Sequence, residues 1–177
     1  MNIKSIDDII KEQGDKLFIG IDVGKLGGIS LISYKDGEET STCMKFSKQL
    51  EEVDSIFKIA KDTFKQEDIV CMIEHVHAFP KQGVVSMFSF GQNLGQWEGM
   101  LVGNGIEYSY VNPREWMSEY VELGMAKKER KRKLLVKAKE IFPNIKVTFN
   151  VSDALLIADY CKNKYYNNIL EGVKIDE

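Results

Sequence analysis

LFIGIDV, residues 17–23, is an uninterrupted run of β-favouring apolar residues that contains a single acid, Asp22. A run of this kind predicts a short strand that is covered on both faces of a sheet. The glycine-rich turn after it leads into GISLISY (28–34), KDGE (35–38) and TSTCMKF (40–46), which predict two more strands joined by a hairpin. The first three strands are therefore expected to be antiparallel.

Helices and strands alternate in the rest of the chain. The patterns predict a helix at 48–65, a buried strand at 68–74, a helix at 85–103, a fifth strand at 106–111, and helices from 113, at 127–142 and at 153–170. A crossover helix returns the fourth strand parallel to the first and beside it. This order predicts an α/β, RNase H-like fold: a mixed five-stranded sheet flanked by helices. We expect one nuclease-type domain over 16–177 after a leader at 1–15.

The composition is that of a globular protein: of 177 residues, 44% are hydrophobic and 29% charged, with a net charge of −3. No run of about 18 apolar residues occurs, so no membrane span is expected. The polar, acidic N-terminus lacks the features of a signal peptide, so we expect an intracellular, cytoplasmic protein.

Positive charge is concentrated in one predicted helix. Its basic residues, set against Glu129 alone, are Lys127, Lys128, Arg130, Lys131, Arg132, Lys133, Lys137 and Lys139. In most proteins such a run is a solvated helix face. Next to an acidic metal site it would instead neutralise phosphates, with a marked dependence of binding on salt. Both interpretations stay open at this point.

Two acids end neighbouring strands of the expected sheet. Asp22 closes the first strand and Glu74 the fourth, so both side chains are expected at one edge. Each acid alone has an ordinary explanation, as a turn former or a lysine partner, and Asp153 alone suits a helix N-terminus. Together they would repel one another, and a divalent cation relieves that repulsion. Mg²⁺ prefers such oxygen ligands, and two ions about 4 Å apart support phosphodiester hydrolysis.

Four segments, taken together, carry a family resemblance: FIGIDVGKLGGIS, IEHVHAFPKQGVVSMFSFGQNLGQWEGML, VNPREWMSEY and SDALLIADY. They resemble phage and bacterial RuvC-like crossover (Holliday) junction endodeoxyribonucleases, over about Leu17 to Tyr160. The resemblance implies an RNase H-like fold, a homodimer, a Mg²⁺ site that Mn²⁺ can also fill, and paired nicks across a four-way DNA junction. By position, Asp22, Glu74 and Asp153 match the catalytic, metal-binding acids of that family.

The chain departs from the family pattern at one ligand. The family usually has a further aspartate three or four residues before the last one, where this chain has Asn150 and Phe149. Asn150 can offer a metal an oxygen but no charge. Asp159 is no substitute, because six residues after Asp153 it faces another side of the helix. The family's lysine near the scissile phosphate falls close to Lys131 and Lys133.

A stripe of small residues marks the predicted helix at 85–103, where Gly91, Gly95, Gly99 and Gly103 recur every four residues. An interior glycine costs a helix about 1 kcal/mol relative to alanine, so the stripe indicates close packing. The partner is either this protein's own sheet or helices, or a second subunit across a symmetric seam. The resemblance favours a homodimer.

The segment before this helix offers possible DNA contacts. Lys81 and Gln82, in the loop 79–83, are candidate DNA-binding residues, and Phe88 is a candidate wedge for an unpaired junction centre, whereas Phe90 is expected in the core. His75 and His77 are spaced poorly for zinc, and a surface-loop role is expected for them.

Two other functions compete with junction resolution. IGIDVGKLGG resembles the phosphate loop of actin-like and sugar-kinase-like modules, but those proteins close two domains around a nucleotide. A non-catalytic junction-binding protein is the other alternative, with Asn150 marking a lost metal site.

Overall fold

The computed structural model describes residues 15–35, 38–77 and 83–173 of the chain. Its elements, in order, are β1 (Lys16–Asp22), β2 (Gly28–Lys35), β3 (Glu38–Lys45), α2 (Leu50–Thr63), a short 3-10 helix η1 (Gln66–Asp68), β4 (Ile69–Glu74), α3 (Val84–Gly103), β5 (Tyr108–Val111), α4 (Pro113–Ser118), α5 (Lys127–Ile141) and α6 (Ser152–Val173). Residues 1–14 of the expected leader (1–15) and the loop residues Lys81 and Gln82 lie outside the described residues.

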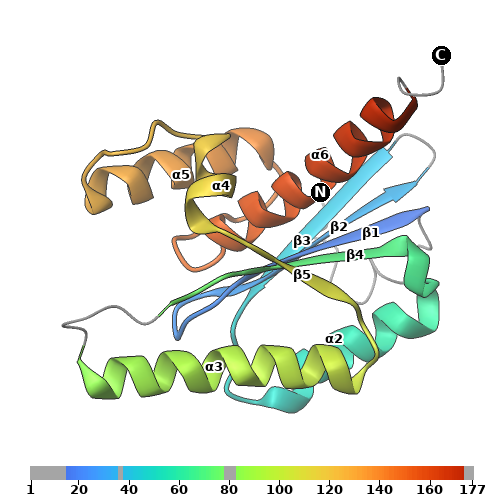
Figure 1. Cartoon of the computed structure of the whole chain (residues 1–177), viewed down its shortest axis with the longest axis horizontal. Coiled ribbons are helices and arrows are strands. Elements are labelled where there is room, and N and C mark those ends of the chain that lie inside the picture. The colour runs from blue at the N-terminus through green and yellow to red at the C-terminus, as the bar shows by residue number, and fades with distance from the viewer. Residues whose placement is uncertain (1–14, 36–37, 78–82, 174–177) are drawn as a thin grey trace.

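One five-stranded mixed sheet, in the order β3-β2-β1-β4-β5, forms the centre of the molecule (Figure 1). Strand β2 is antiparallel to β1 and to β3, and β4 is parallel to β1 and to β5. The strand order and pairing expected from the sequence are confirmed, with boundaries that differ by one or two residues. In the parallel pair Ile21 lies opposite Ile73, so the next residue of each strand, Asp22 and Glu74, emerges at the same end.

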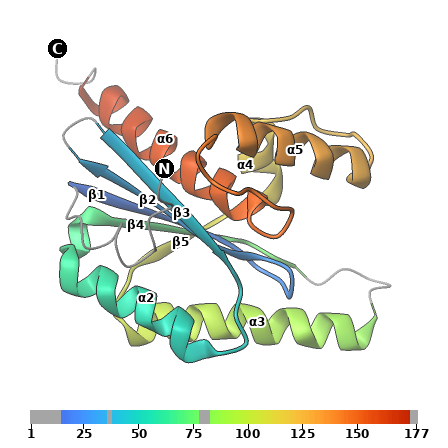
Figure 2. The ribbon, with the colours of Figure 1, turned by 180° about the vertical axis from the view of Figure 1, so that it is seen from behind.

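Helices cover both faces of the sheet (Figures 1 and 2). Helices α2 and α3 lie on one face, and α4, α5 and α6 lie on the other. A hydrophobic core lies on each face of the sheet, and alternate residues of β1 belong to one or the other. Leu17, Ile19 and Ile21 belong to the core beneath α2 and α3, whereas Phe18 belongs to the core beneath α6. Strand β1 is therefore buried on both faces, as its unbroken apolar run predicts.

Helix α6 approaches β1 most closely at Gly20. A Cβ built there would lie 2.3 Å from the backbone nitrogen of Ala158 and 2.5 Å from the carbonyl oxygen of Ala154. No side chain larger than hydrogen fits between strand and helix at this point. The contact fixes the first turns of α6, which carry Asp153, against the strand that ends in Asp22.

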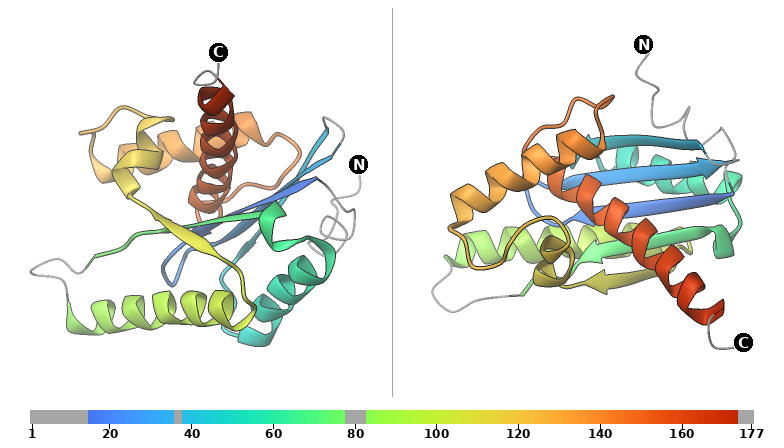
Figure 3. Two further views of the ribbon diagram at one scale, coloured as in Figure 1. Left: turned by 45° about the vertical axis from the view of Figure 1, so that its right-hand side comes forward. Right: turned by 90° about the horizontal axis from the view of Figure 1, so that it is seen from above.

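Two helices extend beyond the sheet at the end where these acids lie. The N-terminal half of α3 and the N-terminal part of α5 project past the same end of the sheet, on opposite faces (Figures 1 and 3). In the part of the chain that is described, no helix combines the length and the apolar character needed to cross a membrane.

Candidate active site

Three carboxylates from separate elements form the candidate site: Asp22 ends β1, Glu74 ends β4, and Asp153 lies in the first turn of α6. All three are partly buried. The turn after Asp22 folds tightly around it, since a Cβ at Gly27 would lie 2.1 Å from the Asp22 carbonyl oxygen and 3.2 Å from its Oδ2. The structure thus assembles at one sheet end the acids that the sequence places 52 and 131 residues apart.

Asp22 and Glu74 are in direct contact through a side-chain hydrogen bond. Burial raises the pKa of Asp22 well above its usual range, and the negative charges of Glu74 and Asp153 raise it further. Burial also raises the pKa of Glu74 to about 7. Burial and the neighbouring negative charges thus favour the protonated form of this pair. Without a cation, the site resists carrying its full negative charge.

Asp153 interacts with this pair electrostatically, because its negative charge raises the pKa of both Asp22 and Glu74. Burial raises the pKa of Asp153, and the positive charges of Lys131 and Arg130 oppose that increase. The Ser152 hydroxyl donates a hydrogen bond to Asp153 Oδ1 at 3.1 Å and holds the carboxylate at the start of the helix.

Trp116 is part of the site, a role that the sequence did not reveal. Its indole Nε1 donates to Glu74 Oε1 at 3.2 Å, and its side chain is 1% exposed. This bond lowers the pKa of Glu74, against the effect of burial. VNPREWMSEY carries the family resemblance, yet nothing in its spacing shows that a residue 42 positions after Glu74 fixes that carboxylate.

The basic residues of α5 divide into two groups. The charge of Lys131 acts on all three acids, and that of Arg130 acts on Asp153. Lys133 forms an exposed ion pair with Glu129 at 3.5 Å and, with Arg132, lines a surface groove beside Tyr120. Lys127 and Lys128 are exposed. Lys131 is thus the lysine of the pair that faces the acids, while the roles of Lys133 and the other cations stay predictions.

The donor chemistry of the acids fits a hard divalent cation. As the side chains are placed, no three His, Cys, Asp or Glu residues in the described ranges form a group that could hold a metal ion. Two carboxylates in contact, with a third within electrostatic range, still provide the oxygen ligands that Mg²⁺ prefers. Asn150 is partly buried and lines a pocket next to this group.

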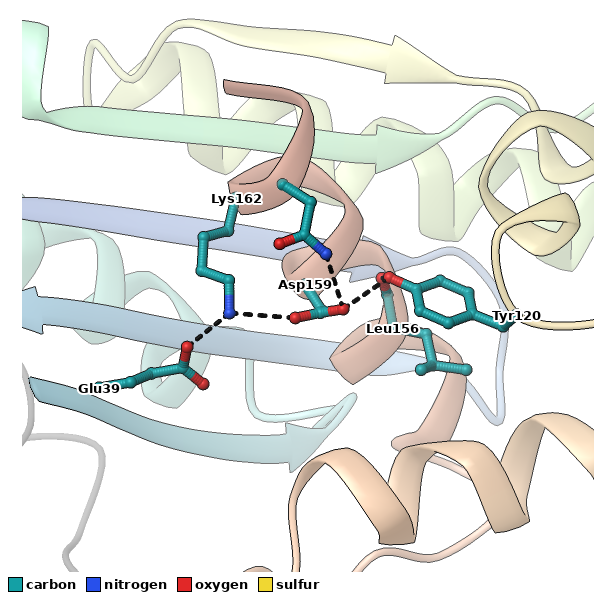
Figure 4. A network of polar contacts seen from close by, with 6 residues as sticks. Glu39, Tyr120, Leu156, Asp159 and Lys162 are labelled. Atoms are coloured by element: carbon teal, nitrogen blue, oxygen red, sulfur yellow. Dashed lines mark hydrogen bonds and ion pairs between the residues drawn. The ribbon is translucent and has the colours of Figure 1, made fainter. Parts of the chain in front are cut away.

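Asp159, on the same helix, has a different environment (Figure 4). It is 5% exposed, and its Oδ2 accepts hydrogen bonds from the Tyr120 hydroxyl at 2.8 Å and from Asn163 Nδ2 at 3.1 Å. Lys162 pairs with its Oδ1 at 3.1 Å and also with Glu39. Asp159 therefore belongs to a structural network, in agreement with the expectation that it does not replace a metal ligand.

The glycine stripe of α3 faces outward. A Cβ built at Gly91, Gly95, Gly99 or Gly103 would meet nothing within 4 Å. Packing against the protein's own sheet or a neighbouring helix, one of the two explanations offered above, is therefore wrong for the described residues. The side chain next to the stripe at Phe88 is 71% exposed, whereas Phe90 packs against the core, as expected.

The two histidines lie beside the acids in an aromatic group. The His75 ring is 4.1 Å from that of His77 and 4.7 Å from that of Tyr110, measured between centroids. Tyr110 hydrogen-bonds in turn to Glu98 of α3. The rings contact one another at the edge of the sheet, where β5 ends.

The geometry can now be compared with known proteins. No protein-family model matches the chain, and no curated protein matches it. RuvC of T. thermophilus in complex with a Holliday junction substrate matches in structure with a TM-score of 0.53 and 15% identity, over 80% of this chain and 90% of that one. The chain has the fold of RuvC. The fowlpox virus Holliday junction resolvase gives a TM-score of 0.44 and 13% identity, over 86% and 99%. The RNase H-like architecture expected from the sequence is confirmed.

Proposed function

We propose that this chain is a Mg²⁺-dependent, structure-selective endonuclease that resolves four-way DNA junctions and related branched DNA in the cytoplasm of a bacterium or phage-infected cell. The observation that carries the proposal is the group of three acids from β1, β4 and α6: burial raises the pKa of each, and the charge of Asp153 raises the pKa of both Asp22 and Glu74 further. The fold supports it, because the T. thermophilus RuvC of similar structure is bound to a Holliday junction.

Each residue of the site would have a separate role in phosphodiester hydrolysis. Asp22, Glu74 and Asp153 would hold the cations, with Asn150 as a neutral oxygen donor nearby. When bound, Mg²⁺ (or Mn²⁺) supplies Lewis-acid chemistry, lowering the pKa of a water and stabilising charge on the leaving oxygen. Asp22 and Glu74 have to be deprotonated before both can serve as ligands, and their raised pKa values oppose this in the absence of a cation. The bond from Trp116 keeps the Glu74 carboxylate in one orientation.

Cations on α5 are needed because the three acids repel DNA. Lys131 and Arg130 lie close enough to the acids to change their pKa values, so a phosphate that reaches the site also reaches these side chains. The exposed Lys127 and Lys128, farther toward the helix N-terminus, would contact phosphates outside the site. Neutralising the backbone in this way makes binding depend strongly on salt.

A homodimer would supply the two cuts that resolution of a four-way junction requires, through helix α3. Its outward glycines are flanked by exposed apolar side chains, with Val84 at 83% and Val102 at 67% exposure. Two such faces can approach closely across a two-fold axis. We expect light scattering to give about twice the 20.2 kDa chain mass, and Gly95→Arg to give the monomer. A wild-type monomer at micromolar concentration would contradict the dimer.

The decisive experiment for the function is cleavage of a labelled four-way junction in Mg²⁺ by wild-type protein and by Asp22→Asn. We expect symmetric nicks from the wild type and none from the variant, with junction binding retained. Binding without product, in Mg²⁺ or Mn²⁺, would favour the non-catalytic junction-binding alternative. Calorimetric binding of ATP by a protein that neither binds nor cuts junctions would favour the nucleotide-binding one.

A further inference from the structure

The pocket that Asn150 lines has a volume of about 840 Å³ and lies mainly on the α3 side of the sheet. The turn between β1 and β2, the end of β3 and the start of α2 form its walls together with α3. Its lining includes Lys25, Lys45, Lys48, Gln92, Asn93 and Gln96. The volume is within the range of about 300–1,000 Å³ that is typical of ligand sites.

Positive charge predominates in this pocket. Three of its lining side chains are lysines, from the turn, from β3 and from the segment after it, and the lone acid is Glu52. The Glu52 carboxylate already accepts a hydrogen bond from the Ser47 hydroxyl at 2.9 Å. None of the three lysines forms an ion pair with another described residue. The uncompensated charge favours an anionic ligand.

Asn93 provides independent support for a ligand. It is 4% exposed, and its Oδ1 accepts a hydrogen bond from the Gly24 N–H at 2.8 Å, which fixes the orientation of the amide. The Nδ2 group, by contrast, has no acceptor among the described residues. A buried donor without a partner destabilises the protein, and an anionic oxygen in the pocket would satisfy it.

Two residues that line the pocket are close in sequence to acids of the candidate active site. Lys25 follows Asp22 by three residues, and Asn150, which also lines the pocket, precedes Asp153 by three. Helix α5, which carries the basic residues 127–139, lies on the opposite side of the sheet (Figure 1). Along one DNA strand a phosphate recurs about every 3.4 Å of helix axis. Because Lys25 lies three residues from Asp22, a strand bound at the acids would have its neighbouring phosphates close to the β1–β2 turn, which forms one wall of this pocket.

We propose that this pocket binds backbone phosphates of a DNA strand on the α3 side of the acids, with the lysines neutralising charge and Asn93 Nδ2 donating to a phosphate oxygen. The inference rests on the proposed nuclease function and adds a second strand contact to the one on α5. Phosphate chemistry is shared with free nucleotides, so the test includes both sources.

The test compares two double variants of equal charge change, Lys45→Ala/Lys48→Ala in the pocket and Lys58→Ala/Lys65→Ala on and just after α2. Fluorescence anisotropy in EDTA measures binding of a labelled four-way junction and of a labelled single strand. The pocket variant should weaken both by about tenfold and reduce the slope of log K against log salt by about 1–2. The α2 variant should match wild type. Asn93→Asp, which keeps the acceptor for Gly24 and adds negative charge, should weaken binding like the pocket variant, with folding checked by thermal melts.

The possible outcomes distinguish failure of the phosphate-pocket proposal from failure of the proposed nuclease function. Unchanged affinity and salt slope in the pocket variant would overturn the proposal that the pocket binds phosphates. Junction cleavage by the wild type would in that case still support the proposed nuclease function. Single-strand binding that depends on the pocket lysines, in a wild type that does not cut junctions, would support the pocket and overturn the nuclease. If the pocket variant loses calorimetric binding of ATP or inorganic phosphate but no DNA affinity, the site belongs to a free nucleotide or phosphate and the DNA assignment is wrong. Wild type that binds neither DNA probe overturns both.

Discussion

Two acids on helix α6, six residues and about 1.7 turns apart, differ in which groups balance their charge. Asp159 accepts hydrogen bonds from Tyr120 and Asn163 and pairs with Lys162, so the chain itself satisfies it. Asp153 belongs instead to a group in which burial raises the pKa of all three carboxylates. A buried carboxylate whose charge is not balanced by hydrogen-bond donors and cations of the protein is a candidate functional residue. One whose charge is fully balanced in this way has a structural role.

The largest contrast is expected in cleavage. Glu74→Gln should reduce the single-turnover rate of junction cleavage by at least about 100-fold, because a lost metal ligand removes several kcal/mol of transition-state stabilisation. Asp159→Asn should keep the rate of the folded protein within about threefold, since Asp159 touches no part of the site. Similar losses in both variants would remove the distinction between the two groups.

Stability should show the reverse pattern. Asp159→Ala should lower the free energy of unfolding by about 2–4 kcal/mol, because Tyr120, Asn163 and Lys162 lose a buried partner. In metal-free protein, Asp153→Ala should change it far less, since an acid with a raised pKa contributes little or negatively. Urea denaturation in EDTA measures both. A larger loss from Asp153→Ala would show that its burial is compensated after all.

Two lysines of α5 allow a matched comparison, with a smaller expected effect on the rate of cleavage. Lys131→Ala should reduce cleavage by about tenfold, because its charge acts on all three acids and on a phosphate bound there, with little change in stability. Lys133→Ala removes the same charge two residues away, where the side chain pairs with Glu129, and should cost less. Equal cleavage by both variants and wild type would exclude a role for either lysine near the scissile phosphate.

The smallest expected effect is a pH dependence of stability. In metal-free protein the pKa of Glu74 rises from 4.5 to about 7 on folding, so the folded state binds more protons than the unfolded one between these values. The free energy of unfolding should therefore fall as pH increases from about 4.5 to about 7, by at most about 1.4 kcal/mol per pH unit for one proton. Glu74→Gln should reduce this slope but not abolish it, because the pKa values of Asp22 and Asp153 are raised too, and Asp159→Asn should leave it in place. A wild-type slope of opposite sign would contradict the raised pKa.

The sequence predicted the sheet well because its signals are local. The apolar run at 17–23, the hairpin turns and the crossover lengths determine strand order and parallel pairing, and these place Asp22 and Glu74 at one edge. The last acid followed only from the family resemblance, because nothing local to Asp153 distinguishes it from an ordinary helix-start acid.

Other features depend on contacts between distant segments, and periodicity carries no information about them. Three hydrogen bonds, from Trp116 to Glu74, from Tyr120 to Asp159 and from Gly24 to Asn93, join residues 39 to 69 positions apart. For the lysines, a helix register error of one residue rotates a side chain by about 100°, so Lys131 and Lys133 could not be separated before the structure.

The contact at Gly20 has a consequence for how the site tolerates change elsewhere. Between β1 and α6 at this point the spacing is set by main-chain atoms, which have no alternative rotamers. Repacking of side chains on either side of the sheet can alter the unfolding free energy without altering the distance between the strand that ends in Asp22 and the helix that begins beside Asp153. Substitutions elsewhere in the core should therefore change the relative position of the three acids little, whereas substitution of Gly20 itself should change it most.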